Sequence, residues 1–182
     1  MLQEIRLVRN LHHENLCVFI GACIEKDHVS VLYEYCSRGC LQELLLHKKL
    51  NLDWMYRVSM ASDLANGLAY LHHSAIGYHG RLTSFTCFID SRFVGKLASF
   101  GLPTFFRSPV DFVEQATHLG NYRELLWTAP ELLRSSLTVV DRGWSGDVYA
   151  FGIILSEIIT LAPPFTMFGI PPKGNQLFKL SI

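Results

Sequence analysis

The sequence predicts an α+β fold that is mostly α-helical. Residues 16–23 and 29–35 are short, rich in apolar, β-branched and aromatic residues, and flank a polar turn, so they predict the two strands of a hairpin. Most of the remaining apolar residues recur at helical spacing, and only short strand-like pieces within residues 87–98 interrupt them. Two strands followed mainly by helices is the element order of an α+β domain.

Three helices are predicted in the first half of the chain. Residues 2–11 have an apolar residue at every third position, which fits one helical face. A short helix is expected over residues 41–45, after the Ser-Arg-Gly sequence at 37–39. Asp53 is placed to cap the longest helix, because a carboxylate there can accept free backbone N–H groups. The apolar stripe of that helix consists of Val58, Ala61, Leu64, Ala65, Leu68 and Leu71.

The second half predicts a small ribbon and two helices. Residues 87–89 and 94–98 read as strands around the turn at 90–92, and a short helix begins near the proline of residues 129–133. An apolar helix follows Asp147 over residues 148–159.

The apolar stretch from residue 148 to residue 165 also has to be compared with a membrane span. It contains Glu157, ends on two prolines and is shorter than the roughly 20 apolar residues that a bilayer requires. A buried core helix is therefore predicted, with no span in this chain. Residues 166–182 show no periodicity and predict an irregular tail.

Composition limits the classes of partner. The 182 residues suffice for one domain, and 16 basic and 16 acidic side chains cancel, which argues against nucleic acid or an anionic membrane surface as a partner. The hydrophobic fraction of 49% predicts a piece of a larger domain that buries surface against other segments. The charged residues near the N-terminus leave no room for a secretory signal.

The cysteines predict free thiols in a reducing compartment, because their number is odd and their spacing is irregular. Cys36 and Cys40 have no second Cys or His pair at zinc-finger spacing, so no metal site is expected. The five cysteines are Cys17, Cys23, Cys36, Cys40 and Cys87.

Four short motifs resemble those of protein kinases and occur in the same order. Kinases carry His-Arg-Asp-Leu followed by Asn, then Asp-Phe-Gly, then Ala-Pro-Glu. Residues 79–86 and 99–101 are similar to the first two motifs, and residues 129–131 are Ala-Pro-Glu. Residues 147–152, Asp-Val-Tyr-Ala-Phe-Gly, resemble a later kinase block. Upstream, residues 2–4 and 13–16 look like the kinase helix that supplies the ion-pairing glutamate, and residues 33–35 lie where kinases keep the gatekeeper and hinge. One match is weak, but six in this order over residues 2–165 are specific.

The resemblance implies a protein-kinase-like domain over residues 1–165, from the αC-like helix to the αF-like helix. This is the C-terminal lobe plus the rear part of the N-terminal lobe. The Gly-rich loop and its strand lysine would precede Leu2. Tyr33 would be a large gatekeeper that narrows an adenine pocket, or an aromatic residue filling a strand face. The implied nucleotide-binding residues are Glu4, Tyr33, Glu34, Tyr35, Cys36, Phe100 and Gly101.

Three stretches narrow the resemblance to the kinase-homology domain of receptor guanylate cyclases: residues 78–82, 126–134 and 146–155. In that family the domain lies in the cytoplasm between a transmembrane helix and a cyclase domain, and it relays receptor occupancy to cGMP synthesis. The resemblance implies that the parent is a single-pass, homodimeric receptor of the plasma membrane. It also implies the missing N-lobe and the cyclase domain as partners; this chain alone would be cytoplasmic.

The positions that perform phosphoryl transfer in kinases are occupied by other residue types. Arg81 stands at the catalytic aspartate, and a guanidinium stays protonated and has no acceptor for a proton. Thr86 stands at the magnesium-binding asparagine, and Ser99 removes the anionic metal ligand. A catalytically dead segment is expected, with no cofactor of its own and ATP binding left open for the parent. The alternatives are a fragment of an active serine/threonine or tyrosine kinase and a generic helical interaction module.

Structural roles are expected for His79, Glu131 and Asp147. His79 is predicted to be packed and hydrogen-bonded, and Glu131 would pair with an arginine beyond Ile182. In kinases the residue matching Asp147 accepts hydrogen bonds from the catalytic-loop backbone; the alternative is an exposed helix cap. Glu4 is expected to be solvated in this chain, and the other histidines of the eight to be surface or cap residues.

Overall fold

The computed structural model describes residues 2–24, 29–47, 52–102, 105, 122–134 and 143–166. The predicted turn at 25–28 and the predicted tail after residue 166 lie outside these ranges. In chain order the elements are α1 (Leu2–Arg9), β1 (Phe19–Ile24), β2 (Val29–Tyr33), α2 (Leu41–Leu46), α3 (Trp54–His73), β3 (Cys87–Ile89), β4 (Gly95–Leu97), η1 (Tyr122–Trp127), α5 (Pro130–Arg134) and α6 (Trp144–Thr160).

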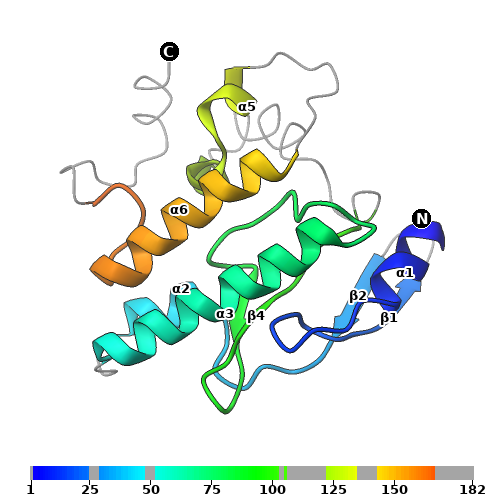
Figure 1. Cartoon of the computed structure of the whole chain (residues 1–182), viewed down its shortest axis with the longest axis horizontal. Helices are drawn as coiled ribbons and strands as arrows, with labels where there is room; N and C mark the ends of the chain where they lie inside the picture. Colours follow the sequence, from blue (N-terminus) through cyan, green and yellow to red (C-terminus); the bar gives the residue numbers. More distant parts are fainter. Residues whose placement is uncertain are drawn as a thin grey trace.

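Helices α3 and α6 lie side by side and form the centre of a helical body (Figure 1). The β3–β4 ribbon packs against α3, and α2 contacts both β3 and α6. Helix α1 and the β1–β2 hairpin lie together at one end of the molecule (Figure 1). The predicted α+β, mostly helical fold is confirmed.

Both predicted hairpins are present, with boundaries that shift by a few residues. Strands β1 and β2 are antiparallel, from Phe19 opposite Tyr33 to Ile24 opposite Val29. The first strand begins later than predicted, because residues 16 and 17 pair with β4 instead of β2. Cys17 N donates to Leu97 O over 2.8 Å, and Leu16 forms a parallel bridge with Leu97.

Helix α3 begins where the sequence predicts. Asp53 is its N-cap, and the Asp53 carboxylate accepts the Tyr56 N–H over 3.1 Å. The predicted stripe is wrong at Val58, which is 49% exposed, whereas Met60 is fully buried. The helix contacts both β4 and α6, so its buried face is wider than one stripe.

Helix α6 begins at Trp144, with Gly143 as the N-cap, so the predicted start at Asp147 is wrong. Gly143 provides no side-chain cap, which explains why the sequence gives no start signal there. Asp147 lies inside the helix and is buried. Within the described ranges, no helix is long and apolar enough to cross a membrane.

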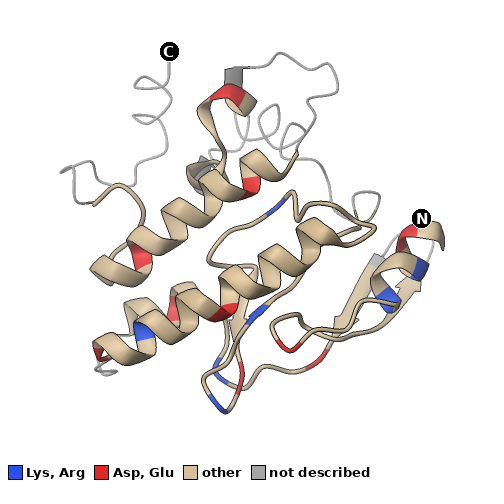
Figure 2. Ribbon diagram, viewed as in Figure 1, with Lys and Arg blue, Asp and Glu red and all other residues tan. Residues whose placement is uncertain are grey.

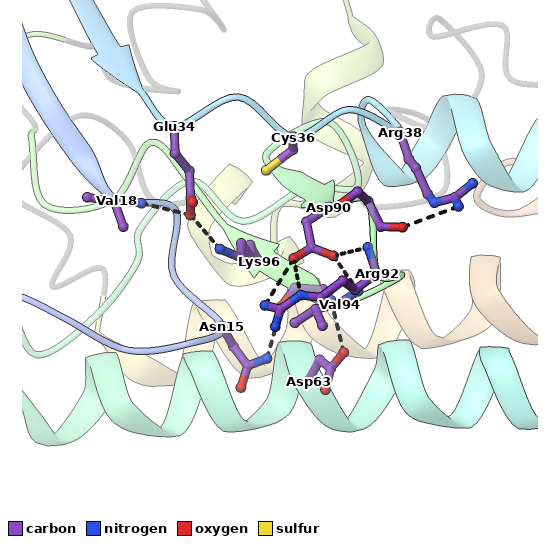
Figure 3. Close-up of polar contacts among 12 residues, drawn as sticks. Asn15, Val18, Glu34, Cys36, Arg38, Asp63, Asp90, Arg92, Val94 and Lys96 are labelled. Carbon is purple, nitrogen blue, oxygen red and sulfur yellow. Dashed lines mark hydrogen bonds and ion pairs between the residues drawn. The ribbon is translucent and has the colours of Figure 1, made fainter.

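The segment between α1 and β1 is clamped between α3 and β4. Asn15 is 1% exposed, and its side-chain amide donates to Gly95 O over 3.1 Å, while Leu97 N donates to Asn15 O over 2.9 Å. Asp63 of α3 accepts the Gly95 N–H over 2.9 Å (Figure 3). A Cβ atom on Gly67 would lie 2.6 Å from Asn15 O, so only glycine allows α3 to approach this segment so closely.

We therefore expect Gly67→Ala to destabilise the protein by about 1–3 kcal/mol, because the added methyl group meets backbone. The matched control is Gly152→Ala in α6, where an added Cβ would meet nothing within 4 Å. This control should stabilise the protein by up to about 1 kcal/mol, since alanine has the higher helix propensity. Urea unfolding of both variants measures the difference, and equal stabilisation of the two would contradict the close approach at Gly67.

Candidate functional site

The segment that resembles a kinase catalytic loop is held by a buried carboxylate of α6. Asp147 is 3% exposed and accepts the backbone N–H groups of His79, over 2.6 Å, and Gly80, over 2.8 Å. His72 Nε2, from the last turn of α3, lies 3.0 Å from the same carboxylate and can only donate to it. Gly80 has φ of +77°, a left-handed conformation that favours glycine. One carboxylate thus joins α6, the end of α3 and the loop.

Asp147 therefore is not an exposed helix cap. His72 is a residue that sequence reasoning missed, because it was assigned with the other histidines to the surface or to caps. No local signal identifies it: its partner is 75 residues away in the chain. Only the packing of α3 against α6 brings the two side chains together.

His79 is part of a buried column that runs from α1 to α6. Its ring lies edge-on to Phe100, with centroids 6.2 Å apart, and both residues are almost fully buried. Next to Phe100, an added Cβ on Gly101 would lie 2.4 Å from Ile76 Cδ1 and 3.0 Å from Val8 Cγ2 of α1. Gly101 also has φ of +68°, so only glycine fits at this position.

Burial lowers the pKa of His79, and the negative charge of Asp147 only partly opposes this effect. The imidazole is therefore neutral at pH 7, and its Nδ1 accepts the Arg81 N–H over 3.3 Å. This is a packed, hydrogen-bonded histidine, as the sequence analysis expects.

Three positions depart from the kinase pattern. Arg81 and Thr86 lie in an ordered loop at 79–86, and Ser99 follows β4. The Thr86 hydroxyl accepts the Thr83 N–H over 3.0 Å and lies within hydrogen-bonding distance of the carbonyls of Arg81 and Thr83. Thr86 O accepts the Ala98 N–H over 2.9 Å, which joins the loop to the end of β4. Ser99 follows with φ of +63°. The loop thus keeps a defined backbone without an acidic side chain at these positions.

Asp90 is the one acidic residue between Tyr78 and Leu102. Its carboxylate accepts the N–H groups of Arg92, over 2.8 Å, and Val94, over 3.0 Å. It therefore stabilises the β3–β4 turn and does not face the loop at 79–86. A shift of alignment by one residue does not bring an acid to the position of Arg81.

A second buried carboxylate ties the loop to the segment before Ala-Pro-Glu. Glu157 of α6 is 2% exposed and accepts the Ser84 hydroxyl over 2.9 Å and the Trp127 indole N–H over 2.8 Å. Burial raises the pKa of Glu157 to about 7, although hydrogen bonds from Trp127, Ser84 and Gln42 lower it. In the sequence, Glu157 served only as evidence against a membrane span, so this network was missed.

The segment after β2, which resembles a kinase hinge, is held by an ion pair. Glu34 Oε1 lies 2.7 Å from Lys96 Nζ of β4 and also accepts the Val18 N–H over 3.1 Å (Figure 3). Tyr35 is 89% exposed, whereas Cys36 is 6% exposed. Tyr33 is half-buried against Phe19, and burial raises the pKa of its hydroxyl. Lys96 is a further residue that sequence reasoning missed.

The remaining predicted residues lie apart from the loop. Glu4 is half-buried, so the expectation of a solvated glutamate is wrong; α1 packs against β1. Glu131 is exposed on α5, and its pairing with an arginine stays a prediction. Basic and acidic residues are interspersed along the described ribbon (Figure 2). In the described part of the chain, no three His, Cys, Asp or Glu side chains are placed to hold a metal ion.

Replacing Asp147 tests whether the loop depends on its carboxylate. Asp147→Ala should cost about 2–4 kcal/mol, because it leaves buried N–H groups unsatisfied. Asp147→Asn should cost about 1–2 kcal/mol, because its amide replaces one acceptor oxygen by a donor. The exposed cap Asp53 is the control, with about 1 kcal/mol for Ala and little for Asn. Urea unfolding gives all four values, and Asp53-like losses at Asp147 would contradict the buried role.

Glu157 should make the protein less stable as the pH rises. Below its ordinary pKa of 4.5 both states are protonated; between 4.5 and about 7 the folded state keeps a proton that the unfolded state has released. The free energy of unfolding of Glu157→Gln relative to wild type should therefore increase by about 3 kcal/mol between pH 4 and pH 8. Urea titrations at several pH values measure this difference, and a constant value across the range would disprove the raised pKa.

Comparison with known proteins supports the resemblance to protein kinases. A family model described as protein tyrosine and serine/threonine kinase matches residues 1–169. Human atrial natriuretic peptide receptor 2 is 42% identical over 179 residues, which are 98% of this chain and 17% of that receptor. The speract receptor of Strongylocentrotus purpuratus is 39% identical over 163 residues, which are 89% of this chain and 14% of that receptor.

Receptor-type guanylate cyclase gcy-28 of Caenorhabditis elegans is 40% identical over 178 residues, covering 98% of this chain and 14% of that protein. This chain thus spans less than a fifth of the length of these relatives. The family match covers most of the chain, and the fold and the order of the motifs agree with it. The chain therefore belongs to the protein tyrosine and serine/threonine kinase family.

Proposed function

We propose that this chain is a catalytically dead kinase-homology segment of a receptor guanylate cyclase. It regulates cGMP synthesis by a cyclase domain outside this chain and transfers no phosphate. The observation that carries the proposal is the loop at 79–86, which keeps its shape through Asp147 while Arg81 and Thr86 replace the groups that phosphoryl transfer uses. Similarity to a receptor-type guanylate cyclase supports the choice of parent.

The chemistry of the loop argues against an active kinase. Kinases position the substrate hydroxyl with an aspartate and hold magnesium with an asparagine and an aspartate. Arg81 cannot accept a proton, the Thr86 hydroxyl is engaged with the loop backbone, and Ser99 has no charge to offer a metal ion. A fragment of an active serine/threonine or tyrosine kinase is the weaker alternative for this reason.

Nucleotide binding in the parent is a separate part of the proposal. Tyr33, Glu34 and Cys36 lie along one segment, and Phe100 with Gly101 lies at the end of β4. Tyr35 directs its side chain to solvent, so only its backbone would take part. ATP would bind to these residues together with a Gly-rich loop supplied by the parent.

The surroundings of the segment follow from the proposed parent. It would lie on the cytoplasmic side of the plasma membrane, in a homodimeric single-pass receptor. Ile20, Ile24 and Leu32 of the hairpin are 67%, 48% and 54% exposed, and further strands of the N-lobe would cover them. The partners are that lobe and the cyclase domain.

A phosphotransfer assay and a chimeric receptor test the proposal together. The chain should incorporate no labelled phosphate into general protein substrates above a control without protein. Residues 1–165, exchanged for the matching segment of human atrial natriuretic peptide receptor 2, should preserve peptide-stimulated cGMP production. Asp147→Ala in the chimera should reduce the stimulation several-fold, because the loop loses its shape, whereas the exposed cap variant Asp53→Asn should not.

Two results would count against the proposal. Incorporation of labelled phosphate above the control without protein would favour the active-kinase alternative. A chimera that reaches the cell surface with normal basal cyclase activity, yet gives no stimulated cGMP, would show that the segment does not relay the signal.

A further inference from the structure

Two buried thiols meet where the β1–β2 hairpin joins the helical body. Cys17 lies just before β1 and Cys36 just after β2, and their Sγ atoms are 3.8 Å apart. They are 3% and 6% exposed and form a small buried cluster with Ala98, against which Tyr33 and Phe88 pack. We propose that Cys17 and Cys36 are a modification site at which a hydroperoxide forms a reversible disulfide across the neck of the hairpin.

Backbone hydrogen bonds and one ion pair hold the two cysteines near each other. Glu34 N donates to Val18 O over 2.9 Å, so the two strands of the hairpin continue side by side as far as the thiols. Cys17 N is fixed to Leu97 O of β4 over 2.8 Å. The Glu34–Lys96 ion pair ties the segment that leads to Cys36 onto the same strand (Figure 3). The contact between the sulfur atoms therefore belongs to an ordered region.

The geometry requires a modest movement to form the bond. A disulfide has a sulfur–sulfur distance of about 2.05 Å, so the two atoms must approach by somewhat less than 2 Å. Both residues are buried, and Cys36, which is slightly more exposed than Cys17, is the better placed for the first reaction with oxidant.

The reaction balances with one hydroperoxide. The sulfur of Cys36 attacks the peroxide, the O–O bond breaks, and a sulfenic acid forms with release of water or an alcohol. The sulfur of Cys17 then attacks the sulfenic sulfur, the S–O bond breaks, and the S–S bond forms with loss of a second water. The two thiols lose two electrons and two protons, which the peroxide takes up. A small dithiol reverses the reaction.

The rate should be slow, because thiolates are the reactive species and burial raises the pKa of both thiols. The exposed Cys23 should react first. The same burial should slow, but not prevent, reduction of the finished disulfide by a small dithiol. Oxidation would link the segment from Tyr33 to Cys36 covalently to Cys17, at the base of the hairpin and next to β4.

Oxidation of the folded chain tests the site. The whole chain carrying Cys23→Ser is reduced, treated with hydrogen peroxide, unfolded and alkylated with N-ethylmaleimide. Two fewer thiols than in the reduced sample should be alkylated, and peptide mapping should find Cys17 linked to Cys36. Dithiothreitol should restore both thiols, and the oxidised protein should have a higher urea midpoint than the reduced protein.

Matched variants distinguish this pair from the other buried thiols. Cys17→Ala and Cys36→Ala should each abolish the crosslink, whereas Cys40→Ala should leave it intact. A crosslink that joins other cysteines would overturn the proposal. So would the absence of any crosslink in folded wild-type protein at peroxide concentrations that crosslink the urea-unfolded chain, and this comparison does not depend on the folding of any variant.

Discussion

The buried carboxylate of Asp147 is the interaction on which the arrangement of the helical body depends. It accepts hydrogen bonds from two successive backbone N–H groups of the loop and contacts His72 of α3. A buried carboxylate is costly unless its lone pairs are satisfied, and here each oxygen has a donor. The position of α6, the end of α3 and the path of the loop are thereby determined together. Moving any one of them leaves a buried charge or buried N–H groups without partners.

The loop shows that shape and chemistry depend on different residues. Thr86 closes the loop through its own hydroxyl, and Glu157 fixes its middle through Ser84. None of these contacts needs an acidic group at Arg81 or Ser99. A loop of this kind can therefore lose the groups that transfer phosphate and still present a constant surface to its neighbours. This supports the proposal that the chain acts as a relay and not as a kinase.

Much of the fold could be predicted from local patterns, but the contacts of the site could not. The cap at Asp53, the hairpin and the helix spacing of α3 are signals within a few residues. His72 with Asp147, and Glu34 with Lys96, are joined across 75 and 62 residues, and no local pattern marks them. The resemblance to kinase motifs identified the loop, because those motifs are recognised by their order along the chain and not by contacts between distant residues. The start of α6 was misplaced because Gly143 carries no capping side chain.

A relay also needs mechanical continuity between the hairpin end and the helical body. The column from Val8 through Phe100 and His79 to Asp147 contains no exposed residue, because all four are buried. Gly101 lets this column close, since any side chain there would push Ile76 and Val8 away. Val8 of α1 belongs to the same buried core as Phe100, so displacing α1 would open a cavity in that core, which is costly. Under the proposed function, this packing is the route by which movement of α1 reaches the loop, and it needs no chemical step.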